Sequence, residues 1–374
     1  MSRQRSLIKT ISAVLAAGLI ALPLAPAEAC TYIRLRGKDG SYHPARTMEW
    51  GAFDLKPSFS IYPRGAHLTA MTMPDGKAGA RWTATYGFAG INLLGKPLFA
   101  DVINEKALTI HLLYLPGFAE YQPYEPDQAS SSIGPSDFMT YMVSQFATVA
   151  EVKAALSRVR VVPIVEAAIG FPAPVHFVVT DPSGAQMAVE YVGGKLSVYT
   201  ETVSAMTNSP PYDWHLTNLR NYLNLRAVAW PKVTVEKLNL GPIGEGSGMI
   251  GLPGDFTPPS RFVRAVAFTQ TARPTEGGFD TTREEFRILD NFNAPLEAVE
   301  PELPPGLGKL CCSATQYTVS FDPTNMLMYY HTDDDRTVRR IDLKTIDFGK
   351  LKAPYSQPLR RTNQPPVDDV TPHF

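Results

Sequence analysis

The sequence predicts an α+β protein in which strands and helices form separate layers. Alternation of apolar and polar residues with a period of two recurs along the chain, which is typical of strands. Proline is abundant, at 33 of 374 residues, and it favours turns and edge strands over long helices. The predicted strands come in groups and the helices in blocks, whereas a parallel sheet would need them to alternate.

Short turn sequences separate several of the predicted strands. Asp181-Pro182-Ser183-Gly184 and Gly193-Gly194 divide one region into three strands, and Asp322-Pro323-Thr324-Asn325 closes a later hairpin. The predicted strands cover residues 107–114, 175–180, 186–191, 195–199, 316–321 and 326–332.

Capping signals predict the helices. Thr148 and Glu151 form a capping box ahead of residues 152–156, and Thr281 and Glu284 repeat the pattern. Thr257-Pro258 supplies an N-cap and a first-turn proline before residues 261–271. Residues 355–374 are rich in proline and polar side chains, so we expect a loosely held tail.

Composition and motifs exclude several classes of protein. The chain is 44% hydrophobic, which excludes a wholly disordered chain. Its 35 basic and 36 acidic residues give a net charge of −1, so the excess of positive charge typical of nucleic-acid-binding proteins is absent. The segment from Gly246 to Gly251 matches a dinucleotide fingerprint, but Leu252-Pro253-Gly254 follows and cannot open the required helix. The seven histidines lack ligand spacing. We therefore expect neither a metal nor an organic cofactor.

The first residues have the pattern of a secretory signal peptide. Basic residues at 3–9 precede an apolar stretch at 11–24, and Ala27-Glu28-Ala29 forms an A-x-A cleavage site. The apolar stretch is too short to span a bilayer, and no later one is long enough. We expect a periplasmic or secreted protein with a leader at 1–29, a catalytic domain at 30–354 and the tail. A lipoprotein anchored at Cys30 is the alternative.

Cleavage would make Cys30 the first residue, with a free α-amine next to its thiol. An α-amine has an ordinary pKa of about 7.7–8.0, so it can act as a base near neutral pH. A thiol activated by its own amine is an established variant of the catalytic triad. Cysteine is rare in this chain, with three residues, although a cleavage site can precede a cysteine by coincidence.

Four further segments contain charged, polar or aromatic residues that could form a catalytic site around Cys30. Arg46 and Glu49 are three residues apart, and in a straight strand this offset directs them to opposite faces, so a surface pair is an equal alternative. Residues 99–106 are expected to be a turn that leads into the strand ending at residue 114. Residues 206–215 are polar and aromatic, and residues 252–262 place Arg261 in the first turn of a helix.

These segments resemble the choloylglycine hydrolase family, which contains bile salt hydrolases and penicillin V acylases. The resemblance runs in order from Cys30 to about Leu343, and its most specific motifs are Thr207-Asn208-Ser209-Pro210 and Leu252-Pro253-Gly254-Asp255-Phe256-Thr257-Pro258. It implies the N-terminal nucleophile fold, a four-layer αββα sandwich of two antiparallel sheets. It also implies an amidase that hydrolyses linear amides.

The resemblance also implies roles for individual residues. Cys30 matches the nucleophile that forms an acyl-thioester, and its α-amine would pass the proton to the leaving amine. Asn208 matches the side chain that donates to the oxyanion, together with the backbone N–H of Tyr114. Loss of one such donor typically lowers the rate by about 10²–10³.

Three charged residues complete the implied site. Arg46 matches an arginine beside the thiol, where its charge would favour the thiolate. Glu49 stands where the family usually has an aspartate that holds the α-amine, and it carries one extra methylene. Arg261 matches a site arginine, to which we assign electrostatic support. Val102 and Ala107 replace glycines that are common in the family.

The substrate is expected to be a small acyl amide. The position of Tyr114 is commonly tyrosine in penicillin V acylases and asparagine in bile salt hydrolases, which favours aryl-acyl amides. Trp50, Phe53 and Phe88 are candidates for an apolar acyl pocket, although each could be an ordinary core aromatic. N-acyl homoserine lactones and bile salts are alternative substrates, and an inactive exported binding protein is the alternative of another class.

The segment 218–250 resembles a projecting hairpin through which family members assemble. We therefore expect a homotetramer. Cys311 and Cys312 are adjacent and so are sterically poor partners for each other, and the sequence assigns them no role.

Overall fold

Two antiparallel sheets stacked face to face form the centre of the molecule in this computed structural model. The structure describes residues 30–51, 53–295, 298–299 and 315–361. The predicted leader at 1–29 and the Cys311-Cys312 pair lie outside these residues. The six-stranded sheet runs, in spatial order, β14 (Ala205–Met206), β1 (Thr31–Arg36), β2 (Tyr42–Glu49), β17 (Thr315–Asp322), β18 (Leu327–Thr332) and β19 (Arg339–Asp342).

The second sheet has eight strands. In spatial order these are β13 (Lys195–Tyr199), β12 (Gln186–Val192), β11 (Val175–Thr180), β8 (Thr109–Tyr114), β7 (Leu98–Asn104), β6 (Phe88–Leu93), β3 (Ser58–Tyr62) and β20 (Tyr355–Pro358). Its inner strand β11 is apolar along most of its length and buries every residue, as expected for a strand covered on both faces.

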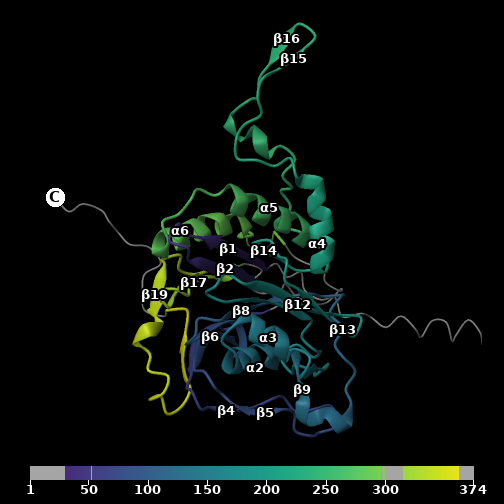
Figure 1. Cartoon of the computed structure of the whole chain (residues 1–374), viewed down its shortest axis with the longest axis vertical. Helices are drawn as coiled ribbons and strands as arrows, with labels where there is room; N and C mark the ends of the chain where they lie inside the picture. Colours follow the sequence, from purple (N-terminus) through teal and green to yellow (C-terminus); the bar gives the residue numbers. More distant parts are fainter. Residues whose placement is uncertain (1–29, 52, 296–297, 300–314, 362–374) are drawn as a thin grey trace, which may run out of the picture.

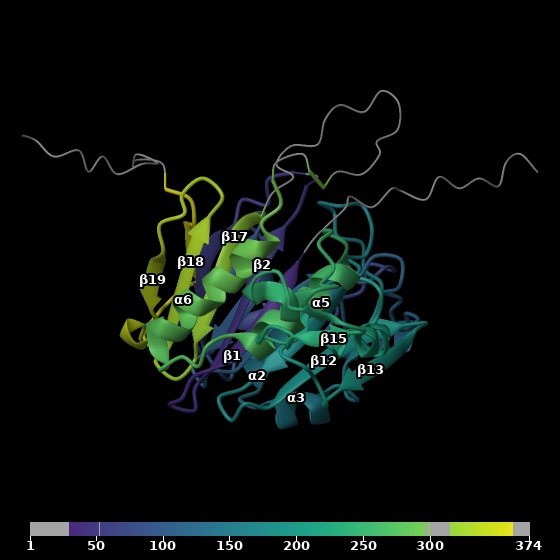
Figure 2. The ribbon, with the colours of Figure 1, turned by 90° about the horizontal axis from the view of Figure 1, so that it is seen from above.

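Helices cover the outer face of each sheet. Helices α5 (Pro258–Thr271) and α6 (Gly278–Leu289) pack on β1, β2 and β17 of the six-stranded sheet, as Figure 2 shows from above. Helix α2 (Phe138–Gln145) packs on β7 and β8, next to α3 (Val149–Ala155). The four-layer αββα order expected from the resemblance is therefore confirmed (Figure 1).

Smaller elements lie around this sandwich. They are the pairs β4 (His67–Thr69) with β5 (Arg81–Thr83), β9 (Ser132–Ile133) with β10 (Arg160–Val161), and β15 (Val233–Val235) with β16 (Leu238–Leu240), together with helix α4 (Tyr212–Leu219) and the 3-10 turns at 126–131, 135–137, 220–222, 245–249, 290–292 and 343–345. Among the described residues, no helix has both the length and the apolar character needed to cross a bilayer.

Several of the predicted elements agree with the structure. The strands predicted at 175–180 and 195–199 are β11 and β13. The capping box of Thr148 and Glu151 begins α3, and Thr257 is the N-cap of α5, with Pro258 as its first residue.

Three local predictions are wrong. The predicted turn at 99–106 is strand β7 as far as Asn104, because its side chains are buried between β6 and β8. Thr281 does not begin a helix, since α6 starts three residues earlier, after Gly277 with φ 105°. The first residues of the predicted loose tail form β20, which pairs with β3 and is followed by the buried Leu359, while residues 362–374 of that tail lie outside the described residues.

Ala107 lies at the turn between β7 and β8 and adopts φ 63°, in the left-handed region. Glycine enters this region freely, whereas a residue with a Cβ does so at a cost of about 1 kcal/mol. Ala107 therefore holds a backbone conformation that favours glycine, in agreement with the glycine that the resemblance implies at this position.

The segment between α4 and α5 forms an arm that projects from the body of the molecule. It ends in the β15–β16 hairpin, which lies far from both sheets (Figure 1). Large apolar side chains on the arm are exposed, including Leu223 (77%), Val228 (66%) and Leu238 (64%). The predicted projecting hairpin is therefore present.

Candidate active site

Cys30 lies at the start of β1, in the layer between the two sheets. Thr31 pairs with Thr47 of β2, so the backbone register brings Cys30 opposite Met48. The Cys30 Sγ is 4.0 Å from the Met48 Sδ, and the residue is only 3% exposed. The nucleophile predicted from the sequence is therefore buried inside the sandwich.

Asn208 connects Cys30 to the eight-stranded sheet. The backbone N–H of Cys30 donates to Asn208 Oδ1 at 2.8 Å, and Asn208 Nδ2 donates to the carbonyl oxygen of Tyr114 at 2.8 Å. Tyr114 is the last residue of β8. The start of β1, the loop after β14 and the end of β8 thus converge at one point.

Arg261 binds the same residues from the helical layer. Its Nη1 donates to the carbonyl oxygen of Cys30 at 2.5 Å and to Thr31 Oγ1 at 2.9 Å, and its Nη2 donates to Asn208 Oδ1 at 2.7 Å. Its Nε donates to the Phe256 carbonyl oxygen at 2.9 Å. The side chain is fully buried, and desolvation lowers its pKa to about 10.

Arg46 approaches Cys30 from the space between the sheets. Its Nη1 is 3.5 Å from Asp101 Oδ1 on β7, and its Nη2 is 3.6 Å from the Met48 Sδ. Asp101 also accepts from His111 Nδ1 at 2.8 Å and from the Tyr317 hydroxyl at 2.6 Å. A fully buried carboxylate with several donors therefore fixes the arginine and balances its charge.

Glu49 occupies the other face of β2. Its Oε1 accepts from the Thr315 hydroxyl at 2.8 Å, and its Oε2 has no hydrogen-bond partner in the described part of the chain. Burial raises the pKa of this carboxyl to about 7, against the lowering effect of the Arg261 charge. The alternative of a surface pair is wrong, because Arg46 is 0% and Glu49 only 5% exposed. The two side chains do lie on opposite faces, and both reach the surroundings of Cys30.

The electrostatic balance at Cys30 differs from the expectation. Burial raises the pKa of the thiol, whereas Arg46 lowers it, the Glu49 charge raises it, and the Glu49 backbone N–H and Arg261 lower it. The net direction is upward, so the protonated thiol is the resting form. The cations alone do not generate a thiolate, and a base is needed.

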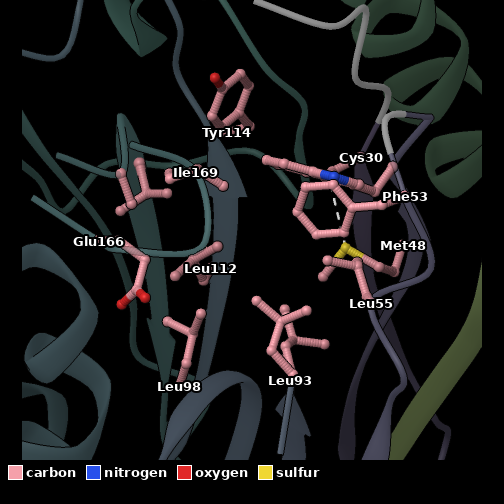
Figure 3. Close-up of a pocket in the computed structure, with 14 residues that line it drawn as sticks. Cys30, Met48, Phe53, Leu55, Leu93, Leu98, Leu112, Tyr114, Glu166 and Ile169 are labelled. Atoms are coloured by element: carbon pink, nitrogen blue, oxygen red, sulfur yellow. Dashed lines mark hydrogen bonds between the residues drawn. The ribbon is translucent and has the colours of Figure 1, made fainter. Parts of the chain in front are cut away.

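An apolar cavity opens beside Cys30. It contains about 600 Å³ of empty space, including its open mouth. Figure 3 shows Leu112 and Tyr114 on one side, facing Cys30 and Phe53 on the other. The Trp50 ring lies 5.5 Å from the rings of both Phe53 and Tyr114. The lining residues are Cys30, Met48, Trp50, Phe53, Leu55, Leu93, Leu94, Leu98, Leu112, Tyr114, Glu166, Ile169, Ala173 and Val175.

The structure brings together every predicted site residue except Phe88. Phe88 does not line the cavity: its ring stacks on Tyr62 at 5.0 Å and packs against Phe99 at 5.5 Å, in the core below the second sheet. Phe88 and Phe53 are both single aromatic residues in the sequence, and only the structure shows that Phe88 begins β6 whereas Phe53 lies in the loop between β2 and β3.

Asp101 is the site residue that the sequence reasoning missed. It belongs to a segment that was interpreted as a turn, in which a carboxylate would be solvated. Phe99–Asn104 shows no alternation, and the apolar residues on both sides of Asp101 are the signal that could have indicated a buried segment. The described residues contain no group of His, Cys, Asp and Glu that could hold a metal ion.

Comparison with known proteins agrees with this geometry. The family model described as linear amide C–N hydrolases, choloylglycine hydrolase family, matches residues 30–354. A bile salt hydrolase/transferase of Clostridium perfringens is 30% identical over 336 residues, covering 87% of this chain and 96% of the relative. A penicillin V acylase of Pectobacterium atrosepticum is 25% identical over 361 residues, covering 90% and 88%.

Solved structures share the fold. A variant of conjugated bile acid hydrolase from Clostridium perfringens has a TM-score of 0.76 at 26% identity, covering 91% of this chain and all of that one. The penicillin V acylase from Agrobacterium tumefaciens has a TM-score of 0.67 at 24% identity, covering 87% and 90%. The predicted N-terminal nucleophile architecture is confirmed by these likenesses.

Proposed function

The chain belongs to the choloylglycine hydrolase family and hydrolyses linear C–N amide bonds, and we propose that it is an exported amidase of the penicillin V acylase type. One observation carries the proposal: Cys30 lines an apolar cavity, and its backbone nitrogen donates to Asn208. A nucleophile, its own amine and an acyl-binding cavity thus meet at a single residue.

The proposed reaction uses only groups of this chain and water. The Cys30 α-amine takes the thiol proton, and the sulfur attacks the amide carbonyl carbon to give a tetrahedral oxyanion. The C–N bond then breaks, and the α-ammonium gives its proton to the leaving amine, which leaves a thioester. Water attacks the thioester carbon and gives a proton to the α-amine; this proton returns to the sulfur when the acid departs. The raised pKa of the buried thiol makes this base necessary.

Asn208 and Tyr114 are proposed to stabilise the oxyanion. The Asn208 amide has two N–H groups, of which one donates to the Tyr114 carbonyl, so the other can serve the substrate. The Leu115 N–H donates to the Pro174 carbonyl oxygen, and in an antiparallel pair the residue before it, Tyr114, directs its N–H and C=O to the opposite side of the strand. This argument supports the Tyr114 N–H as the second donor, on the side where Asn208 lies.

The cavity supports an apolar acyl group as substrate. Its walls are leucine, isoleucine, valine and aromatic side chains, and its carboxylate, Glu166, is already paired with Lys96 at 2.9 Å. The hydroxyl groups of a bile acid would lose water there without gaining matching partners. A phenyl or alkyl chain carries no such cost, which favours penicillin V or an N-acyl homoserine lactone.

Export and processing belong to the same proposal. The cleavage pattern at Ala27-Glu28-Ala29 would release Cys30 as the first residue of a periplasmic or secreted protein. Processing would then convert the Cys30 N–H, now bonded to Asn208, into the α-amine that the mechanism requires.

We also propose that the protein is a homotetramer. The exposed apolar side chains of the arm support this state, because monomers rarely leave such a surface in water. An apolar groove at the base of the arm, lined by Leu219, Leu223 and Val263 among others, is a matching surface on the same molecule. Sedimentation at the monomer mass would contradict the proposal.

The test is amine release by the mature protein from penicillin V, a glycine-conjugated bile salt and a long-chain acyl homoserine lactone. We expect turnover of the first, abolished in Cys30→Ala, and loss of turnover in protein that keeps residues before Cys30. Turnover of the bile salt alone would reassign the substrate. No turnover of any of the three, with Cys30 as the verified N-terminus, would favour a binding protein.

A further inference from the structure

Two buried histidines hold the loop that carries Asn208. His176 on β11 lies with its Nε2 2.9 Å from the carbonyl oxygen of Thr207. His215 on α4 lies with its Nε2 2.9 Å from the carbonyl oxygen of Asn208 itself. Both histidines are 1% exposed. Two consecutive carbonyl groups of this loop are thus bound by side chains from two different layers.

Glu190 on β12 holds His176 in turn. Its Oε1 is 2.8 Å from His176 Nδ1, and this carboxylate is fully buried. Both Glu190 oxygens also accept the N–H of Tyr212, the first residue of α4, at 3.1 Å. One carboxylate therefore fixes both the imidazole and the start of the helix that supplies His215.

The hydrogen-bond partners determine where the protons lie. The Thr207 carbonyl only accepts, so His176 Nε2 carries a proton, and an ionised Glu190 also only accepts, so Nδ1 carries one as well. With Glu190 ionised, His176 carries both ring protons, and this is the arrangement that the NMR measurement below tests. His215 differs, because its Nδ1 has no hydrogen-bond partner among the described residues and burial lowers its pKa to about 4. His215 is neutral.

Other titratable groups face this pair from the surrounding elements. Tyr199 on β13 and the Tyr212 side chain on α4 both interact electrostatically with Glu190. His215 interacts with His176, and the neighbouring positive charge lowers its pKa further. None of these groups replaces Glu190 as the acceptor for His176 Nδ1, which is a direct contact at 2.8 Å.

We propose that His176, held by Glu190, is a positioning residue that fixes the Asn208 amide for the transition state. The proposal rests on the proposed function, because it assigns the oxyanion contact to Asn208. The Asn208 side chain is also held by Cys30, Tyr114 and Arg261, so loss of the His176 bond would tilt the amide N–H that faces the substrate without releasing Cys30. Displacement of a catalytic group by about 1 Å can lower the rate about 10²-fold.

The test compares two reactions of Cys30 in the processed protein. In His176→Leu we expect kcat for the amide substrate to fall about 10- to 100-fold with little change in KM. Alkylation of Cys30 by iodoacetamide should keep its wild-type rate, because attack on a saturated carbon forms no oxyanion. A parallel fall of both rates would indicate general damage to the site and would overturn the positioning role, as would an unchanged kcat.

The matched control is His331→Leu. His331 on β18 is also a buried histidine, with an exposure of 3%, and it packs against Phe286 away from the loop. We expect wild-type rates in both reactions. Equal losses in the two leucine variants would assign the effect to the removal of any buried histidine and would contradict the proposal.

Glu190→Gln tests the proton arrangement without removing a hydrogen bond. The glutamine oxygen can accept from Tyr212 while its amide donates to the Nδ1 of a neutral His176, so we expect kcat to stay within about threefold. Nitrogen-15 NMR of His176 should show both ring nitrogens protonated in the wild type and only Nε2 in the variant. A bare Nδ1 in the wild type, or loss of turnover in a folded Glu190→Gln, would overturn the proposal.

Wild-type turnover separates the two proposals. If the wild type hydrolyses an amide and His176→Leu matches it, the positioning role fails and the proposed function stands. If the wild type hydrolyses none of the three amides, the proposed function fails, and the positioning role fails with it.

Discussion

Arg46 and Arg261 are both fully buried beside Cys30, but they are balanced in different ways. Arg46 faces the carboxylate of Asp101 at 3.5 Å, whereas Arg261 donates to neutral oxygens of Cys30, Thr31, Asn208 and Phe256. Burial lowers the pKa of both guanidinium groups. For Arg46 the charges of Cys30 and Asp101 outweigh burial and raise its pKa above the ordinary value, while for Arg261 the net result is a pKa of about 10.

This difference indicates separate tasks for two identical side chains. Arg46 with Asp101 forms a charge pair between the sheets, and its effect on the thiol is electrostatic. Arg261 forms no ion pair within the described residues and uses its donors to hold the Cys30 carbonyl and the Asn208 oxygen in place. The electrostatic support expected from Arg261 is therefore accompanied by a second role, which is to hold Cys30 and Asn208 in place. This role needs the planar set of donors of a guanidinium group.

Replacement of Arg261 should have the largest effect on turnover. Lysine keeps the charge but cannot bind Cys30, Thr31 and Asn208 together, so buried oxygens are left without donors. We expect Arg261→Lys to lower kcat/KM by at least about 10²-fold and the free energy of unfolding by about 2–4 kcal/mol. Steady-state kinetics and urea unfolding measure the two losses. A fully active Arg261→Lys would show that charge alone suffices and would remove the distinction between the arginines.

The effect of replacing Arg46 on stability should depend on its partner Asp101. Arg46→Met leaves Asp101 buried without its cation, which typically costs about 3–5 kcal/mol. The double variant Arg46→Met/Asp101→Asn should recover most of the stability but not the turnover, because the thiol still lacks its nearest cation. The free energies of unfolding of the two single variants and the double variant form a thermodynamic cycle. Additive losses would show that the two residues are not coupled.

The pH dependence of stability tests Glu49, the buried carboxyl group whose pKa the Arg261 charge lowers. Its pKa rises from 4.5 to about 7 on folding, so between these values the native state binds more protons than the unfolded state. The free energy of unfolding therefore falls as pH rises from 4.5 to about 7, by about 3 kcal/mol in total at about 1.4 kcal/mol per unit. Glu49→Gln should flatten this part of the stability curve, and an unchanged slope would contradict the raised pKa.

Arg264 should give the smallest effect. It lies on the same helix as Arg261, is less buried, and donates to the carbonyl oxygens of Pro253 and Asp255 at 2.8 and 2.6 Å. Arg264→Lys should lower stability by about 1 kcal/mol and change turnover less than about twofold. A loss similar to that of Arg261→Lys would mean that any arginine of α5 serves the site, so this variant is also the control for the first prediction.

Much of the fold could be predicted because local patterns agree with the tertiary structure. Apolar alternation marks β11 and β13, and the Thr148 capping box marks α3, each through contacts within or next to the element. Strand β7 could not be recognised in the same way, since Asp101 interrupts its apolar residues. That carboxylate is tolerated only because Arg46, His111 and Tyr317 meet it from other strands.

The candidate site shows the same limit. Spacing correctly placed Arg46 and Glu49 on opposite faces of one strand, but it could not show that both faces of β2 are covered by other layers. Ala107 could not be interpreted either, because its φ of 63° is fixed by the hairpin that it closes. Cys30 contacts Asn208, 178 positions later in the chain, and Arg261, 231 positions later. Only the assembled layers define these contacts.

The two sheets each supply half of the site, and this has a mechanical consequence. Cys30 directly precedes β1 of the six-stranded sheet and Tyr114 ends β8 of the eight-stranded one, so the distance from the proposed nucleophile to the proposed oxyanion donor follows the separation of the sheets. A core substitution that thickens or thins the layer between them will alter the reaction geometry without contacting the substrate. Hydrostatic pressure favours states with less internal void volume, so we expect turnover to respond to pressure through the packing between the two sheets.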